Sequence, residues 1–212
     1  NFESKKYLNK LGVKNIQYLG NLKFSQLDTK NNKLDNNFKD FIKKKKNWCA
    51  VSTHPGEEEI CLKIHKKLNK IHKNLILIII PRHTQRVQQI SKEIKNLNLN
   101  YHLHSDKEKI DKNTNVYLVD TYGDTNLFFN TCKNIFIGKS LTVDGGQNPL
   151  EPARHNCTII HGPHVSNFTE IYNYLDKKKI SFKIQNEKFL YSKLKFFISK
   201  KNNSNNVNKK LN

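Results

Sequence analysis

The chain has 212 residues, a formal net charge of +20 and 36% hydrophobic residues. This length can bury one sizeable core or two small ones, so we expect one or two globular domains. The charge favours an anionic partner, which could be nucleic acid, a nucleotide or an acidic lipid surface. Lysine far outnumbers arginine, however, and asparagine and isoleucine are abundant, as an AT-rich coding sequence would produce. We attribute roughly half of the basic excess to that bias, so charge alone decides little about function.

The cysteines and the apolar runs argue against several classes of protein. Cys49, Cys61, Cys132 and Cys157 are widely separated and form no CxxC pair. This spacing predicts buried free thiols in a reducing cytosol, and neither a disulfide framework nor a zinc site. The longest apolar run, Leu75 to Ile80, is too short to span a bilayer, and no signal peptide is recognised. The chain is predicted to be soluble as written.

The first 47 residues are predicted to lie outside the main domain. Residues 5–12 predict a helix closed by Gly12, followed by a short strand at Ile16 to Leu19 and by the segment Gly20 to Phe24. Residues 1–24 therefore look like the end of a preceding domain. Residues 25–47 are rich in lysine and asparagine, and we interpret them as a linker with one weak helix.

The main domain is predicted at residues 48–200, where apolar runs alternate with helical periods. Strands are expected at residues 48–52, 75–80, 99–102, 116–120, 135–138, 158–161 and 180–184. One helix is expected to bury Ile60, Ile64, Leu68 and Ile71, and the next is expected to bury Val87, Ile90, Ile94 and Leu97. Three more helices are expected at residues 126–132, 165–175 and 187–198. Continuous apolar strands separated by helices predict an α/β fold, a Rossmann-like parallel sheet with helices on both faces. Residues 201–212 are too polar to fold and are predicted to be a disordered tail.

Four loops follow the predicted strands at one edge of this sheet. They comprise residues 52–57, 81–83, 120–124 and 145–151. Ligands of such sheets bind outside the carboxyl ends of the strands. The loops offer hydroxyls, one arginine, backbone amides and carboxylates, which together predict a pocket for a phosphorylated sugar or a nucleotide.

The glycine-rich loop is the most informative of the four. Gly145 and Gly146 allow backbone amides to approach a ligand closely. Asn148 is a candidate helix cap and Pro149 suits a first helical turn. A helix start of this kind attracts phosphate, and Glu151 could accept hydrogen bonds from the two hydroxyls of a ribose. The loop therefore predicts recognition of a nucleotide.

Each candidate also has a structural alternative. Ser52 and Thr53 could merely cap the following helix, which is about as frequent as ligand contact. Arg82 directly follows a buried strand, and we weigh it roughly two to one in favour of a functional role over a structural ion pair. Glu57 to Glu59 most simply match the dipole of the helix that they begin. Nothing local identifies a general base among the loop histidines His54, His83 and His164.

Several motifs, in order along the chain, resemble the donor-side half of the 3-deoxy-D-manno-octulosonic acid (Kdo) transferases. They are Trp48 to Glu58, Pro81-Arg82-His83 with Arg86, Asp120 to Gly123, and Gly145 to Ala153 with Gly162-Pro163-His164. Gly20 to Phe24 resembles the segment that precedes the crossover between the two halves of that family. The similarity spans about residues 7–178, and four matching blocks in sequence are far more specific than one glycine-rich loop.

The resemblance implies one half of a GT-B glycosyltransferase, in which two Rossmann-like halves face each other across a cleft. It implies inverting transfer of Kdo from CMP-Kdo to a lipid A precursor in lipopolysaccharide biosynthesis, with no metal or other cofactor, at the cytoplasmic face of the bacterial inner membrane. Residues 1–24 would then end the acceptor-side domain. The rest of that half, with its membrane-binding segment and general base, is absent from this sequence, so we expect donor binding with little transfer.

The donor-binding residues also follow from the resemblance. Ser52, Thr53 and Arg82 would surround the donor phosphate and cytidine, Gly123 would belong to the same site, and Gly145, Gly146, Asn148 and Glu151 would hold phosphate and ribose. Amides and an arginine can stabilise the charge that develops on a CMP leaving group without a cation. The chain departs from the family pattern at Gln147 (usually His), Lys139 (usually Gly), and Tyr122 and Asp124 (usually Met and Glu). Gln147 can donate a hydrogen bond but cannot carry a proton, which puts any acid role there in doubt.

Two other functions remain open. The chain could be a catalytically silent module that binds a CMP-sugar and needs a separate acceptor-domain chain, which predicts an exposed apolar face around residues 1–24. It could instead be a basic nucleic-acid-associated protein that uses lysines such as Lys43 to Lys46, but it lacks a stacking platform or a nucleic-acid motif. Basic residues of the last helix and tail could also touch an anionic membrane surface, although a solvated lysine face is the simpler account.

Overall fold

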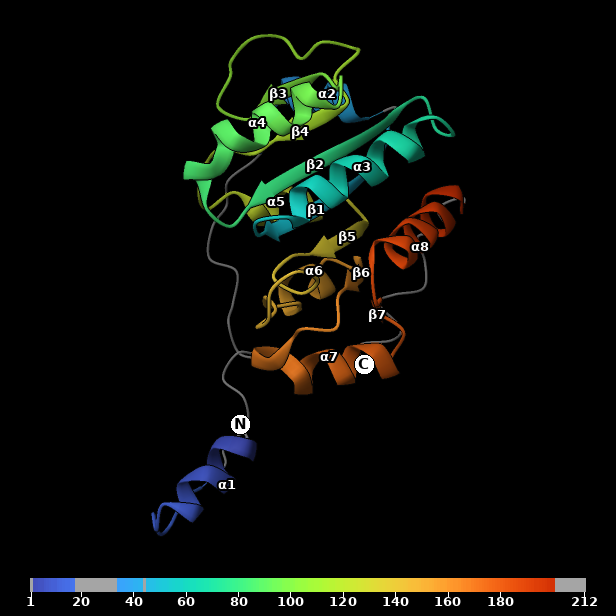
Figure 1. Ribbon diagram of the computed structural model, residues 1–212. Helices are drawn as coiled ribbons and strands as arrows, with labels where there is room; N and C mark the ends of the chain where they lie inside the picture. Colours follow the sequence, from blue (N-terminus) through green and yellow to red (C-terminus); the bar gives the residue numbers. More distant parts are fainter. Residues whose placement is uncertain (1, 18–33, 44, 201–212) are drawn as a thin grey trace. The chain divides into compact units, whose positions relative to one another are not determined.

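The computed structural model describes residues 2–17, 34–43 and 45–200 (Figure 1). The chain divides into two compact units, residues 1–31 and 32–212. The segment Gly20 to Phe24 and the expected tail at residues 201–212 lie outside the described residues.

The first unit contains the predicted helix, which is α1 (Phe2–Lys10). After its last turn the N–H of Leu11 donates to the carbonyl of Tyr7 over 3.1 Å, and Gly12 follows with a φ of 82°. Residues 16 and 17 form no strand, and the rest of the strand expected there is not described. Exposed apolar side chains are present on the described part of this unit: Tyr7, Leu8, Leu11 and Val13.

The second unit contains the predicted parallel sheet. Its seven strands are arranged in the order β3-β4-β2-β1-β5-β6-β7, and every neighbouring pair is parallel. The strands are β1 (Lys46–Thr53), β2 (Leu75–Pro81), β3 (Tyr101–Leu103), β4 (Val116–Leu118), β5 (Asn134–Ile137), β6 (Thr158–His161) and β7 (Ser181–Lys183). The predicted fold class is therefore confirmed.

Helices cover both faces of the sheet. One layer consists of α3 (Glu57–Asn69), α4 (Val87–Asn96) and α8 (Glu187–Ser199). The other consists of α2 (Asn36–Ile42), α5 (Thr125–Phe129), α6 (Leu150–Arg154) and α7 (Thr169–Lys177). Two 3₁₀ turns, η2 (Thr84–Arg86) and η3 (Ser166–Phe168), precede α4 and α7. Strand β2 is apolar throughout because its successive residues point into different layers.

Strand β1 shows this alternation. Cys49 and Val51 are buried in the α2-side cluster, whereas Trp48 and Ala50 are buried in the α3-side cluster. All four cysteines of the chain are buried free thiols, as the sequence predicts. Within the described residues, no helix is long and apolar enough to cross a lipid bilayer.

Helix α3 buries the predicted face but ends earlier than predicted. Ile64 and Leu68 are buried and Ile60 is partly buried, whereas Ile71 lies beyond the end of the helix and is 49% exposed. The buried face also includes Cys61 and His65. The prediction followed the isoleucine and leucine spacing and extended the helix too far.

Helix α2 lies in the region that the sequence suggested to be a linker. Its Phe38 and Ile42 are buried, and the Phe38 ring lies 4.5 Å from the ring of Tyr117 and 5.4 Å from that of Phe128. The weak predicted helix is therefore part of the packed core. The division of the chain into functional domains stays a prediction.

Candidate functional site

The switch point of the sheet lies between β1 and β5, because the chain proceeds toward β2 on one side and toward β6 on the other. The loops that follow these two strands approach each other closely. The N–H of Gly138 donates to the carbonyl of Val51 over 2.8 Å, and a Cβ at Gly138 would lie 2.4 Å from the carbonyl oxygen of Ser52. Ser52 and Lys139 both have left-handed backbone angles, with φ values of 53° and 54°. Such angles are uncommon outside glycine and indicate local strain at this junction.

Glu57 joins these two loops. Its carboxylate is fully buried and accepts hydrogen bonds from the N–H groups of Lys139 (2.8 Å), Ser140 (3.0 Å), Leu141 (3.0 Å) and His54 (3.0 Å). Interpreting Glu57 only as a match for the helix dipole was therefore incomplete. The partners at 139–141 are distant in sequence, so no local pattern identifies them.

Glu58 plays a similar role for the loop after β2. It is fully buried and forms a two-pronged ion pair with Arg86, with Nη1 to Oε1 at 2.6 Å and Nη2 to Oε2 at 3.3 Å. Paired hydrogen bonds of this kind fix both distance and orientation. The pair therefore anchors η2 to the start of α3, which positions the segment that carries Arg82. Arg86 belongs to the sequence motif of this loop, but the sequence alone indicates no role for it.

The predicted site residues of the first two loops lie close together. The N–H of Arg82 donates to the carbonyl of Thr53 over 3.1 Å. The Arg82 side chain is exposed and has no ion-pair partner among the described residues. Thr53 is fully buried, and its hydroxyl has no hydrogen-bond partner within the described part of the chain. Ser52 is half-buried beside it. Among the described residues, the Thr53 hydroxyl is therefore able to form a further hydrogen bond and the Arg82 guanidinium is able to pair with an anion at this corner of the switch point.

Two histidines stand at the same corner. The rings of His54 and His83 pack edge to face with their centroids 5.6 Å apart. Burial lowers the pKa of His54, although the nearby Glu57 carboxylate opposes the shift. His54 is therefore neutral at pH 7 and is suited to hydrogen bonding rather than to binding phosphate as a cation.

The loop after β5 turns back on itself around Ser140. The buried Ser140 hydroxyl donates to the carbonyl of Ile137 over 2.5 Å and accepts from the N–H of Gly162 over 2.9 Å. A Cβ at Gly162 would lie 1.9 Å from the Ser140 carbonyl oxygen, so only glycine fits there. These contacts tie the loop after β5 to the loop after β6.

Gly145 and Gly146 have φ values of 127° and 67°, angles that favour glycine. The N–H of Gly146 donates to the carbonyl of Lys139 over 2.7 Å, and the carbonyl of Gly145 accepts from the N–H of Asn167 over 3.1 Å. The glycine pair therefore shapes the loop as the sequence suggests. The Gly146 amide, however, has a partner within the protein and would have to exchange it to bind a phosphate.

The helix predicted after this loop is α6, and it begins one residue later than expected. Pro149 occupies the N-cap position, and the side-chain oxygen of Asn148 accepts from the N–H of Leu150 over 3.1 Å. Asn148 therefore bonds to the start of the helix from one position before the N-cap and is not itself the N-cap residue that the sequence predicts. Glu151 lies in the first turn and is half-buried. The carbonyl of Gln147 accepts from the hydroxyl of Tyr172 over 2.9 Å, which fixes the approach to α6.

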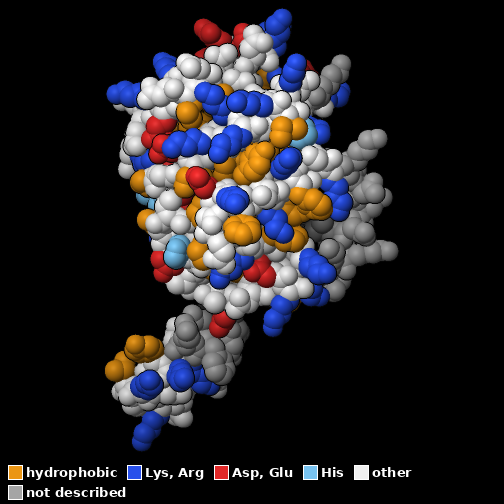
Figure 2. Space-filling view, turned by 45° about the vertical axis from the view of Figure 1, so that its right-hand side comes forward, with side chains coloured by type: hydrophobic (Ala, Val, Ile, Leu, Met, Phe, Trp, Pro, Cys, Tyr) orange, Lys and Arg blue, Asp and Glu red, His pale blue; other side chains and the backbone are white. Residues whose placement is uncertain are grey.

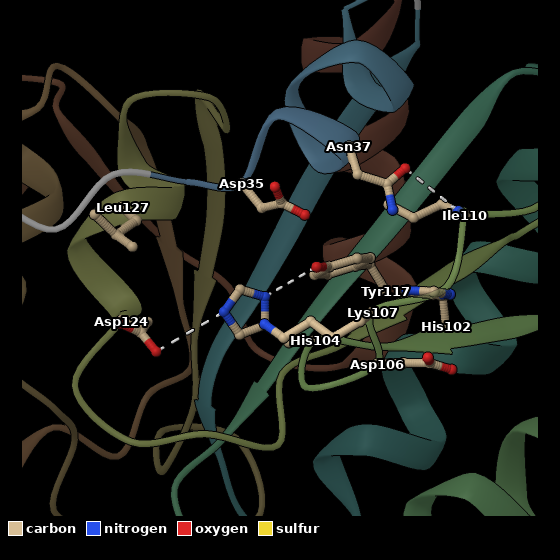
Figure 3. A pocket seen from close by; sticks show the side chains of 10 residues that line it. All are labelled: Asp35, Asn37, His102, His104, Asp106, Lys107, Ile110, Tyr117, Asp124 and Leu127. Carbon is tan, nitrogen blue, oxygen red and sulfur yellow. Dashed lines mark hydrogen bonds and ion pairs between the residues drawn. The ribbon is translucent and has the colours of Figure 1, made fainter.

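A pocket of about 280 Å³ lies at the carboxyl ends of β3 and β4, beside α2 (Figure 3). In it His104 Nδ1 lies 2.9 Å from the Tyr117 hydroxyl, and Nε2 lies 3.8 Å from Asp124. Burial lowers the pKa of His104 against the pull of Asp124 and Asp120. Burial also raises the pKa of Tyr117 well above its ordinary value. Both side chains are therefore neutral at pH 7. We interpret the network as structural: it connects Tyr117 of β4 through His104 to Asp124 in the loop after β4.

That loop carries Gly123 and meets the loop after β2. Asp120 accepts from the N–H and the hydroxyl of Ser105, at 2.9 and 2.5 Å. The exposed Tyr122 hydroxyl accepts from the N–H of Thr84 over 3.4 Å, and this bond, together with the positive charge of Arg82, lowers the pKa of Tyr122. Specific contacts therefore connect the loops after β1, β2, β4 and β5 in one group.

The sheet, its two helical layers and the loops at the switch point define one half of a GT-B glycosyltransferase fold. The C-terminal CMP-Kdo binding domain of WaaA from Acinetobacter baumannii superposes on 74% of this chain and 82% of its own length, with a TM-score of 0.70 and 27% sequence identity. The S. aureus MnaA structure with UDP, at 16% identity and a TM-score of 0.54 over 78% of this chain and 40% of that one, is similar in fold alone.

No family model matches the chain. The 3-deoxy-D-manno-octulosonic acid transferase of Haemophilus influenzae is 38% identical over 128 residues, which cover 60% of this chain and 30% of that protein. The enzyme of that name from Rickettsia conorii is 34% identical over 200 residues, which cover 92% of this chain and 42% of that protein. The chain thus spans less than half the length of these relatives. It is homologous to the C-terminal half of the Kdo transferases, which confirms the resemblance drawn from its motifs.

Proposed function

We propose that this chain is the donor-binding half of a glycosyltransferase that transfers Kdo from CMP-Kdo to a lipid A precursor in lipopolysaccharide biosynthesis. The observation that carries the proposal is the joining of four loops at the switch point of a fold that is homologous to a CMP-Kdo binding domain. A switch point is where sheets of this kind bind nucleotides.

The residues divide between the parts of a CMP-sugar. Arg82 is an exposed cation beside Thr53, whose buried hydroxyl has no partner among the described residues. We assign these two, with Ser52, to the donor phosphate and cytidine. We also assign Gly123, from the loop after β4, to this part of the site. An arginine with its charge unpaired in the described structure can stabilise the charge that develops on a departing CMP.

The ribose and the second side of the phosphate are assigned to the loop after β5. Gly145, Gly146, Asn148 and Glu151 form this part of the proposed site. Asn148 fixes the start of α6 and places Glu151 in its first turn. A carboxylate at that position can accept hydrogen bonds from both hydroxyls of a ribose.

The remaining parts of the proposal rest on homology to the Kdo transferases. They are the lipid A precursor as acceptor, action at the cytoplasmic face of the inner membrane, and the division of the chain into domains. Residues 1–24 are assigned to the acceptor-side domain, 25–47 to a connecting segment whose helix α2 packs on the core, and 48–200 to donor binding. The general base is not assigned to any residue of this chain.

Calorimetric titration with CMP at moderate salt tests the donor site. We expect saturable binding by the parent chain and at least about tenfold weaker binding by Arg82→Ala and by Glu151→Ala, because hydrogen bonds to charged groups contribute about 1.5 to 3 kcal/mol. Lys177→Ala and Glu108→Ala change the same charges at exposed positions outside the four loops. These controls should keep the parent affinity. A folded parent chain that binds no CMP would refute the donor site.

A further inference from the structure

A groove of about 890 Å³ runs along the outside of the helical layer formed by α3, α4 and α8. It is bordered by the second half of α3, by Leu97 after α4, and by the first turns of α8. None of its residues belongs to the four loops of the candidate site. The groove therefore calls for an explanation other than donor binding.

The floor of the groove is apolar. Ile64 is buried, and Leu97 and Tyr191 are partly buried against the core cluster of this layer. At the end of α3, Ile71 leaves 49% of its surface exposed. An isolated exposed isoleucine is ordinary, but this one continues an apolar floor that the protein itself does not cover within the described residues.

The rim of the groove is basic. Of the residues that border it, five are lysines and one is a carboxylate, Glu187. Lys66 donates to the carbonyl of Leu97 over 2.8 Å and Lys63 pairs with Glu59 at 2.6 Å. Within the described residues, the side chains of Lys67, Lys70 and Lys188 have no ion-pair partner. Their charges are available to an anionic surface.

The positive charge continues past the end of the groove. The side chains of His72 and Ser199 lie 3.3 Å apart and connect the ends of α3 and α8. Burial and the neighbouring Lys46 and Lys195 lower the pKa of His72. Figure 2, which brings the right-hand side of Figure 1 forward, shows blue basic side chains alternating with orange hydrophobic ones and few red carboxylates.

We propose that the groove between α3 and α8 docks the protein onto an anionic phospholipid surface. Lysine stems can follow the apolar floor while their ammonium groups reach the headgroup phosphates, and Ile71 can enter the boundary of the acyl region. A rim of lysine charges around an apolar floor matches a surface that presents phosphates above acyl chains. This combination favours a lipid surface over an acidic helix of another protein.

Co-sedimentation of the full chain with vesicles tests the proposal. We expect binding to phosphatidylcholine vesicles that contain phosphatidylglycerol and little binding to phosphatidylcholine alone. Lys67→Glu, Lys70→Glu and Lys188→Glu combined should weaken binding at least about tenfold, since each lysine near an anionic surface contributes roughly fivefold to the binding constant. Lys39→Glu, Lys109→Glu and Lys177→Glu combined make the same change in net charge outside the groove and should bind nearly as the parent does.

A fluorescent label tests the orientation. Because the four native cysteines are buried, an environment-sensitive dye can be attached selectively to Ile71→Cys, or to Asn173→Cys on the exposed surface of α7 as a control. Anionic vesicles should shift the emission of the dye at position 71 to shorter wavelength and leave the dye at position 173 unchanged.

Three results would overturn the proposal. They are absence of binding to anionic vesicles, equal losses in the two lysine variants, and a dye at position 71 that responds to an acidic amphipathic peptide but not to vesicles. CMP titration of the groove variant is measured alongside. Unchanged CMP binding would show that the chain is folded and that the membrane surface is separate from the donor site, whereas failure of the parent to bind CMP would count against the proposed function and not against the groove.

Discussion

Glu57 shapes the candidate site through its backbone partners. Its two carboxylate oxygens accept four N–H groups, one from the loop after β1 and three successive ones from the loop after β5. Burying a carboxylate is costly unless hydrogen bonds compensate its lost hydration. Here converging backbone dipoles provide that compensation. One side chain therefore fixes the relative positions of two loops that are proposed to hold the same ligand.

Replacing this carboxylate should affect both stability and ligand affinity. In Glu57→Gln the side-chain amide group presents N–H donors to backbone N–H donors, so at least one buried hydrogen bond is lost. We expect the free energy of unfolding in urea to fall by about 2 kcal/mol or more and CMP binding to weaken. Glu59→Gln, on the exposed side of the same turn, should leave both quantities unchanged. Unaltered stability of Glu57→Gln would contradict the assigned role.

The buried His65 makes the free energy of unfolding depend on pH. It is fully buried in α3, its Nδ1 accepts from the indole N–H of Trp48 over 3.4 Å, and burial lowers its pKa from 6.5 to about 3. Between these values the unfolded chain binds a proton that the folded chain does not. The contribution of neutral His65 to stability is therefore complete above pH 6.5 and is lost as the pH falls toward 3.

We expect His65→Gln, which keeps an acceptor for Trp48, to reduce this dependence. One proton difference corresponds to about 1.4 kcal/mol per pH unit, so the slope of unfolding free energy against pH between 4 and 6 should be smaller by roughly that amount. Urea denaturation at several pH values, followed by the fluorescence of the single tryptophan, measures the slope. The exposed His164→Gln should retain the parent slope, and a parent slope in His65→Gln would refute the assignment.

At the scale of elements, α2 connects the supposed linker to the candidate site. Phe38 is 1% exposed and packs on Tyr117 and Phe128. The preceding residue, Asn37, borders the His104 pocket, and its amide donates to the carbonyl of Glu108 over 2.8 Å. Helix α2 thus covers the end of β4, from which the loop bearing Gly123 begins.

Removing the aromatic anchor should show that this helix is part of the core. Phe38→Ala leaves a large cavity, and buried phenylalanine-to-alanine changes cost about 3 to 5 kcal/mol. We expect a decrease of that size in the free energy of unfolding. Phe41→Ala, at a partly buried position of the same helix, should cost clearly less. Similar small effects of both changes would mean that residues 34–43 behave as a linker.

At the scale of the whole molecule, the sequence predicted best what depends on local pattern. β2 is buried along its whole length, and such an apolar run identifies a central parallel strand. The position of the candidate-site loops also follows from the sequence, because the loops after parallel strands lie at the same edge of the sheet. Three backbone partners of Glu57 lie 82 to 84 residues away, and Phe38 packs on Tyr117 and Phe128, which are also distant in sequence. No short pattern encodes such contacts. The exposure of Ile71 was also missed, because helical spacing does not reveal where a helix ends.

The net charge of +20 is also compatible with a nucleic-acid-associated protein. The salt dependence of binding distinguishes this function from donor binding. A protein that neutralises many phosphates releases counterions and loses about 10³- to 10⁵-fold in affinity between roughly 50 and 200 mM salt. CMP has one phosphate, so its binding at Arg82 should weaken by less than about tenfold over that range. Calorimetry with CMP and fluorescence anisotropy with a random single-stranded oligonucleotide, at the same salt concentrations, compare the two. Tight oligonucleotide binding at the lower salt that collapses at the higher salt, with no saturable CMP binding at either, would favour a nucleic-acid protein over a nucleotide-sugar transferase.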